Sequence, residues 1–237
     1  MSDLTQILCT QEEMVIGACC SVSQLAESQE VRTYFPALAM AAEQIGSPAV
    51  RNLGTLGGNI MTASPAADLP PALAACKATV RVQGPQEERV LPIEQVFQGP
   101  GRTHLSREEI LAEIHLKIPP QPSGSHFFKL GTRKSLQISI INGACSLSID
   151  ATSGKIATSR IAVGAVAPTL IRSQAAEKIL QDQFPKPDLF DQAGKAAVSE
   201  CSPIDDLRAS AEYRRDMIHI MTRRALQAAL EQTQEQF

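Results

Sequence analysis

Two adjacent glycines, Gly57 and Gly58, lie at the centre of the segment best suited to binding a ligand, with Thr55 and Asn59 on either side. Glycine adopts positive φ angles without steric penalty and leaves its backbone N–H group uncovered. Successive N–H groups in such a loop can form a concave site for a phosphate. Asp68 follows, with a carboxylate able to accept a hydrogen bond from a ribose hydroxyl. The segment therefore predicts a phosphate or nucleotide loop.

The same residues also fit a simpler structural interpretation. Glycine pairs are common in turns, and Asp68 directly precedes an apolar segment, the position at which aspartate caps a helix. The spacing matches neither the dinucleotide fingerprint G-x-G-x-x-G nor a phosphate loop ending in lysine. One aspartate can serve as cap and as ligand, so the residues alone leave both interpretations open.

Composition excludes several classes of protein. The 237 residues include 22 basic and 25 acidic side chains, for a net charge of −3, whereas a dedicated nucleic-acid-binding protein usually carries a basic excess. The apolar runs are far shorter than the roughly 20 residues that span a bilayer. The N-terminus lacks the basic start and apolar core of a secretory signal. We therefore expect no nucleic-acid partner and no membrane segment.

The cysteines and histidines do not form a metal site by spacing. Six scattered cysteines include no C-x-x-C pair, which predicts reduced thiols in a cytoplasmic protein. The four histidines have no spacing typical of metal ligands, and no nucleophile–base pair is apparent. We expect no metal ligand and no catalytic side chain in this chain.

Periodicity and turn residues predict an α+β chain. A proline- and glycine-rich bridge, 119–125, suggests two domains, 1–120 and 121–237. We expect strands at 13–18, 78–84, 88–93 and 110–119, and helices at 21–27 (capped by Ser21 or Ser23), 34–45 and 68–78 (capped by Asp68), with a break at 46–48. Beyond the bridge we expect β-rich segments at 126–133, 138–150 and 159–168, a hairpin turn at 150–155, and two closing helices at 173–181 and 210–232.

The segment "IGSPAVRNLGTLGGNIMTASPAADLPPALAAC", residues 45–76, resembles the second flavin-binding motif of the FAD subunit of molybdenum hydroxylases. That family includes xanthine dehydrogenase, aldehyde oxidoreductase and aerobic carbon monoxide dehydrogenase. Segments 99–111, 126–135 and 203–217 resemble further motifs of the same subunits, in the same order. The resemblance implies an incomplete two-subdomain FAD-binding fold of the PCMH type, followed by a C-terminal domain of antiparallel sheet plus helices.

The resemblance also implies which residues meet FAD. The loop around the glycines would hold the pyrophosphate, Asp68 a sugar or a pyrophosphate-linked group, and Lys129 the isoalloxazine. A cation near the flavin N1–C2=O edge stabilises the anionic reduced state, whereas the alternative is a solvated surface lysine. The full implied set is Ile45, Thr55, Leu56, Gly57, Gly58, Asn59, Thr62, Asp68, Leu111 and Lys129.

Two further features follow from the same resemblance. Four residues of the C-terminal motif are expected to tie the last helix to its sheet or to a neighbouring subunit: Arg208, Tyr213, Arg214 and Arg215. The family's first flavin loop, an "AGGTDL"-like sequence, has no equivalent in these residues. Three explanations fit this observation. A separate small polypeptide supplies the first flavin loop, the true start of the gene lies upstream, or the subunit has lost flavin and kept a scaffold role.

The resulting expectation is an FAD-binding subunit of a heteromeric molybdenum hydroxylase of xanthine dehydrogenase type. Electrons would come from molybdopterin on a large subunit and two [2Fe–2S] clusters on a small subunit. They would pass through FAD to NAD⁺ or another acceptor. The alternatives are a flavin-free scaffold that docks the other two subunits, and a nucleotide-binding module outside redox chemistry.

Overall fold

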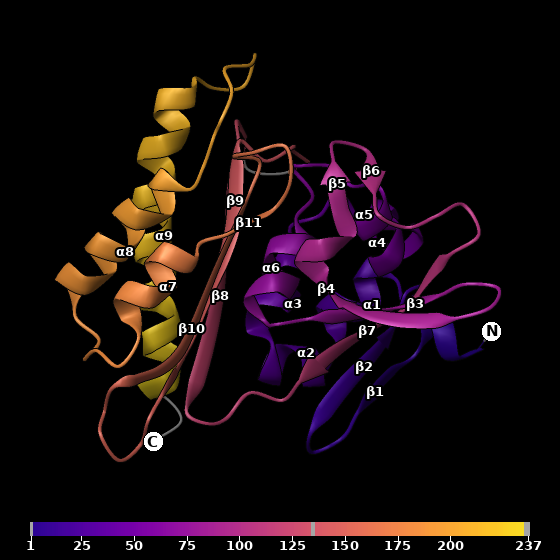
Figure 1. The fold of residues 1–237 in the computed structure, drawn as a ribbon, viewed down its shortest axis with the longest axis horizontal. Helices are drawn as coiled ribbons and strands as arrows, with labels where there is room; N and C mark the ends of the chain where they lie inside the picture. Colours follow the sequence, from indigo (N-terminus) through magenta and orange to yellow (C-terminus); the bar gives the residue numbers. More distant parts are fainter. Residues whose placement is uncertain (1, 134–135, 235–237) are drawn as a thin grey trace.

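The computed structural model describes residues 2–133 and 136–234, which form two lobes packed side by side (Figure 1). The first lobe contains an antiparallel sheet with the strand order β1 (Ile7–Cys9), β2 (Glu13–Gly17), β7 (Ile110–Lys117), β3 (Thr79–Gln83) and β4 (Glu88–Pro92). Its α-helices are α1 (Val22–Glu27), α2 (Gln29–Tyr34), α3 (Pro36–Glu43), α4 (Pro48–Leu53), α5 (Leu56–Met61) and α6 (Leu69–Ala75). Smaller elements are η1 (Ser2–Thr5), η2 (Ile93–Val96) and the hairpin β5 (Phe97–Gly99)–β6 (Arg102–Thr103).

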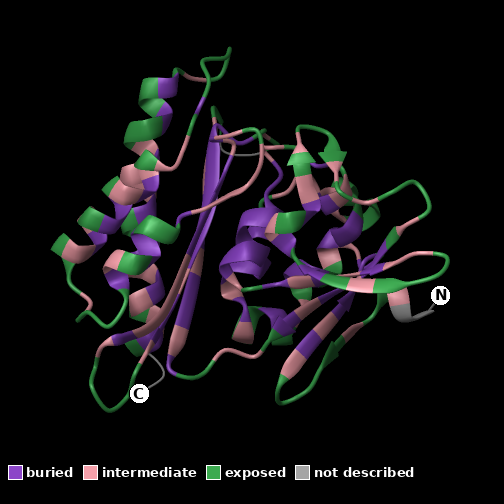
Figure 2. Ribbon diagram, viewed as in Figure 1, coloured by how far each residue is buried: buried purple, intermediate pink, exposed green. Residues whose placement is uncertain are grey.

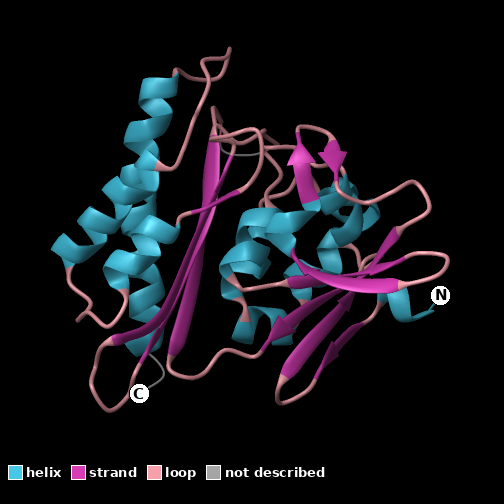
Figure 3. Ribbon diagram, in the orientation of Figure 1, coloured by secondary structure: helices cyan, strands magenta, loops and turns pink. Residues whose placement is uncertain are grey.

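The second lobe is a sheet covered by helices on one face, as Figure 3 shows. Its antiparallel strands run in the order β11 (Ile171–Arg172), β10 (Ile156–Gly164), β9 (Ile141–Ile149) and β8 (Ser123–Leu130). The covering helices are α7 (Gln174–Leu180), α8 (Pro187–Ser199) and α9 (Ala211–Gln234). The opposite face packs against α3 and α6 of the first lobe. This arrangement confirms the α+β class and the expected C-terminal antiparallel sheet plus helices.

Local sequence signals explain the elements that were predicted correctly. The Ser21 side chain accepts a hydrogen bond from the Gln24 amide, and the Gln24 side chain accepts one from the Ser21 amide, so this capping box begins α1. In β7, Ile114 and Leu116 are buried while Lys117 is exposed, as the alternating pattern predicted.

Four α-helices of the described chain were not predicted: α2, α4, α5 and α8. The break expected at 46–48 is the start of α4, because the Ser47 side chain caps it and Pro48 occupies its first turn. Helix α8 lies between the two helices expected at the end of the chain, so three helices, α7, α8 and α9, follow the second sheet in the described residues. Residues 134–135 of the segment 126–135 lie outside the described residues.

The two lobes share buried contacts along their seam. Figure 2 shows buried residues on both sides of it. Phe127, Ala144 and Ala162 of the second sheet belong to the same apolar cluster as Leu38 and Leu73 of α3 and α6. A second cluster fills the space between this sheet and α7–α9. Side chains in the seam are therefore held by both lobes.

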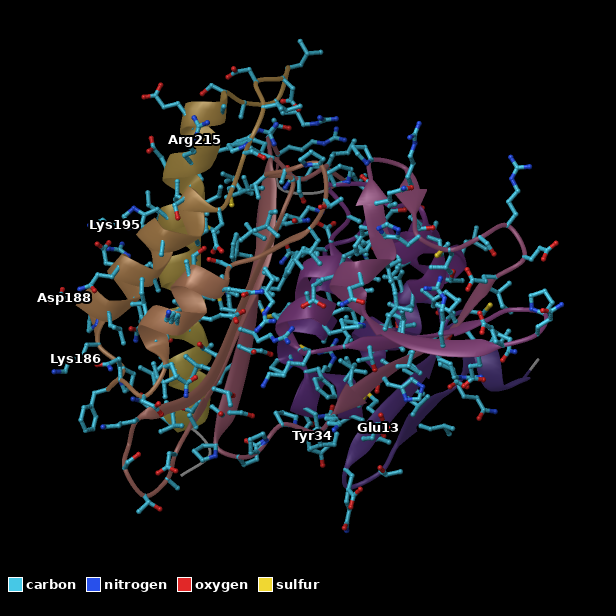
Figure 4. All side chains as sticks on the ribbon, viewed as in Figure 1. Glu13, Tyr34, Lys186, Asp188, Lys195 and Arg215 are labelled. Carbon is cyan, nitrogen blue, oxygen red and sulfur yellow. The ribbon has the colours of Figure 1, made fainter. Side chains whose placement is uncertain are left out.

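Arg214 ties α9 to the sheet, as expected from the C-terminal motif. Its guanidinium is buried and donates hydrogen bonds to the carbonyl oxygens of Ile140 and Ala165. It also pairs with Asp206 at 2.8 Å. The Arg215 side chain instead points to solvent near the start of α9 (Figure 4).

Candidate functional site

The glycine run forms the first turn of helix α5 rather than an open loop. Thr55 is the N-cap, and its hydroxyl accepts a hydrogen bond from the Gly58 amide at 3.0 Å. The amides of Leu56 and Gly57 donate to the carbonyl oxygens of Cys20 and Ala18, at 2.9 and 2.7 Å. These N–H groups are already used within the chain, so the expectation that they are uncovered is wrong for the amides of residues 56–58.

Close packing explains why residue 57 is glycine. A Cβ atom there would lie 2.8 Å from the Ala18 Cβ and 2.9 Å from the Ala18 carbonyl oxygen. Contacts below 3.0 Å force one side to move. Gly57 therefore allows α5 to lie directly against the segment that follows β2. The neighbouring residue, Gly58, is exposed.

Four other implied residues belong to this helix or lie next to it. Leu56 is fully buried, and the Thr62 hydroxyl donates to the Gly58 carbonyl at 2.7 Å at the end of α5. Leu111 lies in the first core on β7, and the next residue of β7 accepts a hydrogen bond from the Ala18 amide. The side-chain oxygen of Asn59 is buried with no hydrogen-bond partner among the described residues. Such an orphaned acceptor fits a polar ligand at this position.

Asp68 does not cap α6. Its backbone stands at the N-cap position with helical angles, φ −87° and ψ −31°, and its side chain makes no capping hydrogen bond. The carboxylate instead points across the seam to the second sheet. One oxygen accepts from Ser139 Oγ and Asn142 Nδ2, each at 2.7 Å, and the other contacts Lys129 Nζ at 2.6 Å. The helix-cap interpretation of Asp68 is therefore wrong.

Lys129 is not a solvated surface lysine. Its side chain is 3% exposed and that of Asp68 is 9% exposed. Besides Asp68, its ammonium donates to the Gln44 carbonyl oxygen at 3.1 Å. The site residues Asp68 and Lys129, predicted separately, thus form one buried ion pair, whose charges are compensated by further hydrogen bonds.

Sequence reasoning missed Ser139 and Asn142, which complete this network. Asn142 is fully buried on β9 and also donates to the Ala67 carbonyl at 3.0 Å. The Asn142 amide group fits at this position because residue 164 is glycine. A Cβ atom on Gly164 would lie 2.2 Å from the side-chain oxygen of Asn142. A polar asparagine inside the apolar segment 138–150 was the signal that could have revealed it.

A pocket of about 400 Å³ opens beside Lys129 at the end of α3. Gln44, Gly46, Arg51 and Gln137 line it, and Ile45 lies between the first two of these residues in the chain. Arg51 holds this turn in place by donating to the carbonyl oxygens of Ile45 and Gly46, at 3.0 and 3.4 Å. The pocket thus combines the cationic side chains of Lys129 and Arg51 with the carboxylate of Glu43 and amide groups, a set that suits a strongly polar ligand.

Among the residues that the structure describes, no group of three or more histidine, cysteine and acidic side chains is arranged to hold a metal ion. All six cysteines are free. No helix in the described ranges is both long and apolar enough to cross a bilayer.

Comparison with known families gives matches along nearly the whole chain. Residues 1–120 match the FAD binding domain in molybdopterin dehydrogenase. Residues 126–229 match the CO dehydrogenase flavoprotein C-terminal domain.

Individual relatives agree with these matches. The xanthine dehydrogenase FAD-binding subunit of Escherichia coli O157:H7 is 33% identical over 218 residues, which is 91% of this chain and 73% of that protein. The carbon monoxide dehydrogenase medium chain of Hydrogenophaga pseudoflava is 33% identical over 217 residues, 91% of this chain and 74% of the relative. A solved structure of carbon monoxide dehydrogenase from the same organism superposes with a TM-score of 0.91, covering 98% of this chain and 80% of the matched one.

The site geometry and these comparisons agree. The buried Asp68–Lys129 pair lies at the seam of the two domains that the family models match. This chain belongs to the FAD-binding medium subunits of the molybdenum hydroxylases, the oxidoreductase family of xanthine dehydrogenase and carbon monoxide dehydrogenase.

Proposed function

We propose that this chain holds FAD at the lobe seam and passes electrons from iron–sulfur clusters of a small partner subunit to NAD⁺ or another acceptor. The observation that carries the proposal is the buried Asp68–Lys129 pair beside a pocket of about 400 Å³. FAD, when bound, accepts and releases electrons singly or as hydride, which lets it connect one-electron clusters to a two-electron acceptor.

The residues around the pocket have distinct roles in this proposal. Lys129 places a fixed positive charge where the flavin ring would gain negative charge on reduction. Asp68, Ser139 and Asn142 orient that ammonium, because their hydrogen bonds fix the carboxylate to which it is paired. Ile45 would line the dinucleotide in the turn that Arg51 braces.

The residues around α5 would hold the phosphate half. Thr55, the exposed Gly58 and Asn59, with its unpaired oxygen, are the groups on which we expect the dinucleotide to lie, with Leu56 and Leu111 as apolar support. Since the amides of residues 56–58 already donate within the chain, the pyrophosphate needs further donors. We propose that a polypeptide segment outside residues 45–76, in this protein or in a separate chain, supplies them.

We propose a large molybdopterin-binding partner and a small partner with [2Fe–2S] clusters, with a reaction of the xanthine dehydrogenase type, as the named relative suggests. The six free, scattered cysteines support a cytoplasmic location. We also propose that the chain divides into domains at 1–120 and 121–237, with Thr62 closing α5 in the first.

One observation favours a second candidate, a flavin-free scaffold. The amides of residues 56–58 and the Asp68–Lys129 charges are all satisfied within the chain, so the fold does not need a ligand to compensate them. A scaffold subunit would use the same seam only to hold its two lobes together.

Flavin loading separates the two candidates. The complex purified from its native host is denatured and the FAD released is measured by absorbance, alongside its molybdenum and iron. The flavin proposal expects about one FAD for each copy of this chain, and lower loading for Lys129→Met. Molybdenum and iron without FAD would contradict it and support the scaffold.

A further inference from the structure

A second cavity lies between the lobes at the opposite end of β8 from Lys129. Its volume is about 340 Å³, within the range of small-molecule sites. Phe35, Pro36, Ile118 and Leu147 supply apolar walls. Figure 4 labels Tyr34 and Glu13, which belong to its rim near the foot of the first lobe.

One wall of this interdomain cavity carries hydroxyl groups that are already fixed by hydrogen bonds. Ser146 Oγ donates to the Ala75 carbonyl at 2.6 Å, and the hydroxyls of Ser148 and Thr158 bond to each other at 2.8 Å. Because these hydroxyls have set orientations, the cavity walls need little rearrangement to receive a ligand.

A basic pocket of about 640 Å³, lined by residues of β10 and α7, lies next to the interdomain cavity. Lys77 and Thr158 line both, so they mark the junction. The basic pocket adds Arg160, Arg172 and Lys178, and Glu177 is its acidic member. The Glu177 carboxylate forms an ion pair with the Arg172 guanidinium, with an N–O distance of 2.7 Å. The Arg160 guanidinium pairs with Glu94 at the same distance.

Two nitrogen groups in the basic pocket lack partners. Within the described residues, Lys77 has no carboxylate within ion-pair distance, and the buried Nε of Arg160 has no hydrogen-bond acceptor. Burial and the neighbouring charges of Arg160 and Arg172 lower the pKa of Lys77. Cations gathered in this way attract an anion.

Lys77 also occupies a backbone position that usually belongs to glycine or asparagine. Its φ is 57°, directly after α6, where its amide donates to the Ala74 carbonyl and the Ala78 amide to that of Leu73. A left-handed conformation costs free energy for a side chain with a Cβ atom. Lys77 adopts this conformation at the junction of the two cavities, both of which it lines.

We propose that the interdomain cavity and the basic pocket together form a binding site for a small amphipathic organic anion. Its apolar, ring-sized body lies between Phe35, Ile118 and Leu147, and its carboxylate or phosphate lies at Lys77 and Arg160. The site is separate from the seam around Lys129, since the two lie at opposite ends of β8.

Calorimetric titration of the full chain with 2-naphthoate, and with its neutral analogue 2-naphthamide, tests the proposal. We expect wild type to bind 2-naphthoate about tenfold or more tightly than 2-naphthamide, the effect of one charge-assisted contact. Lys77→Asn should remove that difference and leave the melting temperature equal or higher, because asparagine tolerates the left-handed conformation. Lys77→Gly provides a second variant suited to the same backbone.

Lys117→Asn is the matched control, since Lys117 lines the interdomain cavity but not the basic pocket. It should keep the preference for the carboxylate. Absence of 2-naphthoate binding, equal affinity for both probes, or equal losses in the Lys77 and Lys117 variants would overturn the proposal. Binding to the isolated chain that disappears in the assembled complex would also overturn it, by showing that a partner subunit covers the site.

Discussion

The ammonium of Lys129 lies 2.6 Å from a carboxylate oxygen of Asp68, although the two residues are 61 positions apart in the chain. One stands before α6 in the first lobe and the other on β8 in the second. Ser139 and Asn142 hold the other carboxylate oxygen. The same contacts therefore join the lobes and fix a positive charge beside the proposed flavin pocket.

Breaking the Asp68–Lys129 pair should strongly destabilise the fold. Lys129→Met or Asp68→Asn leaves one buried charge without its partner, with an expected loss of about 3–5 kcal/mol in the free energy of unfolding. The double variant should lose less than the sum of the single ones, because it leaves no charge alone. Urea denaturation of all four proteins measures this coupling. The exposed pair Arg32–Glu43 is the control, with an expected coupling below about 1 kcal/mol.

Gly57→Ala should destabilise the chain even without flavin. Its new Cβ would lie 2.8 Å from the Ala18 Cβ, so α5 or the segment after β2 must move, at a cost of about 1–3 kcal/mol. Thermal unfolding of the isolated chain measures the loss. Gly99→Ala is the matched control because a Cβ there meets no atom within 4 Å. Equal melting temperatures for the two variants would show that Gly57 is not needed for packing.

Acid should weaken the attachment of α9 through Asp206. Burial raises the pKa of Asp206, but the amides of Arg208 and Ala209 and the guanidinium of Arg214 outweigh it and lower the pKa to about 2. Because the pKa is lower in the folded than in the unfolded chain, this stabilisation is full above about pH 5 and disappears toward pH 2.

Asp206→Asn should therefore cost about 1 kcal/mol near neutral pH, a value reduced by solvent screening, and the difference from wild type should shrink as the pH falls. Urea unfolding measured from pH 7 to pH 2.5 checks this dependence. Asp216→Asn, on the exposed side of α9, should change stability little at any of these pH values. A loss for Asp206→Asn that grows in acid would contradict the assignment.

Lys129 should also set the reduction potential of the bound flavin. In the flavin-loaded complex, Lys129→Met should lower the two-electron potential by about 30–60 mV, the equivalent of one charge-assisted interaction. The Asp68→Asn/Lys129→Met double variant should lower it less, because no uncompensated carboxylate remains. Spectroelectrochemical titration gives the values, and Arg32→Gln is the surface control. Identical potentials for all four proteins would place Lys129 away from the flavin ring.

Sequence reasoning succeeded where one local signal dominates. The start of α1 was predicted with Ser21 or Ser23 as its cap, and Ser21 is the N-cap; Ile114 and Leu116 place β7 with one face in the core. The family resemblance named Asp68 and Lys129 individually. Sequence reasoning failed where residues far apart in the chain decide the partner of a side chain. Asp68 was expected to cap α6, but Lys129, Ser139 and Asn142 offer its carboxylate stronger, buried partners from the other lobe.

The glycine run shows the same limit. Gly57 and Gly58 were expected to expose their amides, yet the Gly57 amide reaches the Ala18 carbonyl, a partner 39 residues earlier that no local pattern indicates. Similarly, residues 46–48 predict a break after the helix at 34–45, although a capping serine followed by proline also begins a helix. A residue type that fits two local structures, such as a turn and a helix start, does not by itself show which one forms. The packing around it decides.

Flavin content tests directly whether this chain carries FAD. The complex from the native host and the isolated chain are each denatured, and the FAD released is quantified by absorbance. The proposal predicts about one FAD per chain in the complex, and less FAD in the isolated chain would show that a separate polypeptide supplies the further pyrophosphate donors. Molybdenum and iron in the complex without FAD would contradict the electron-transfer role.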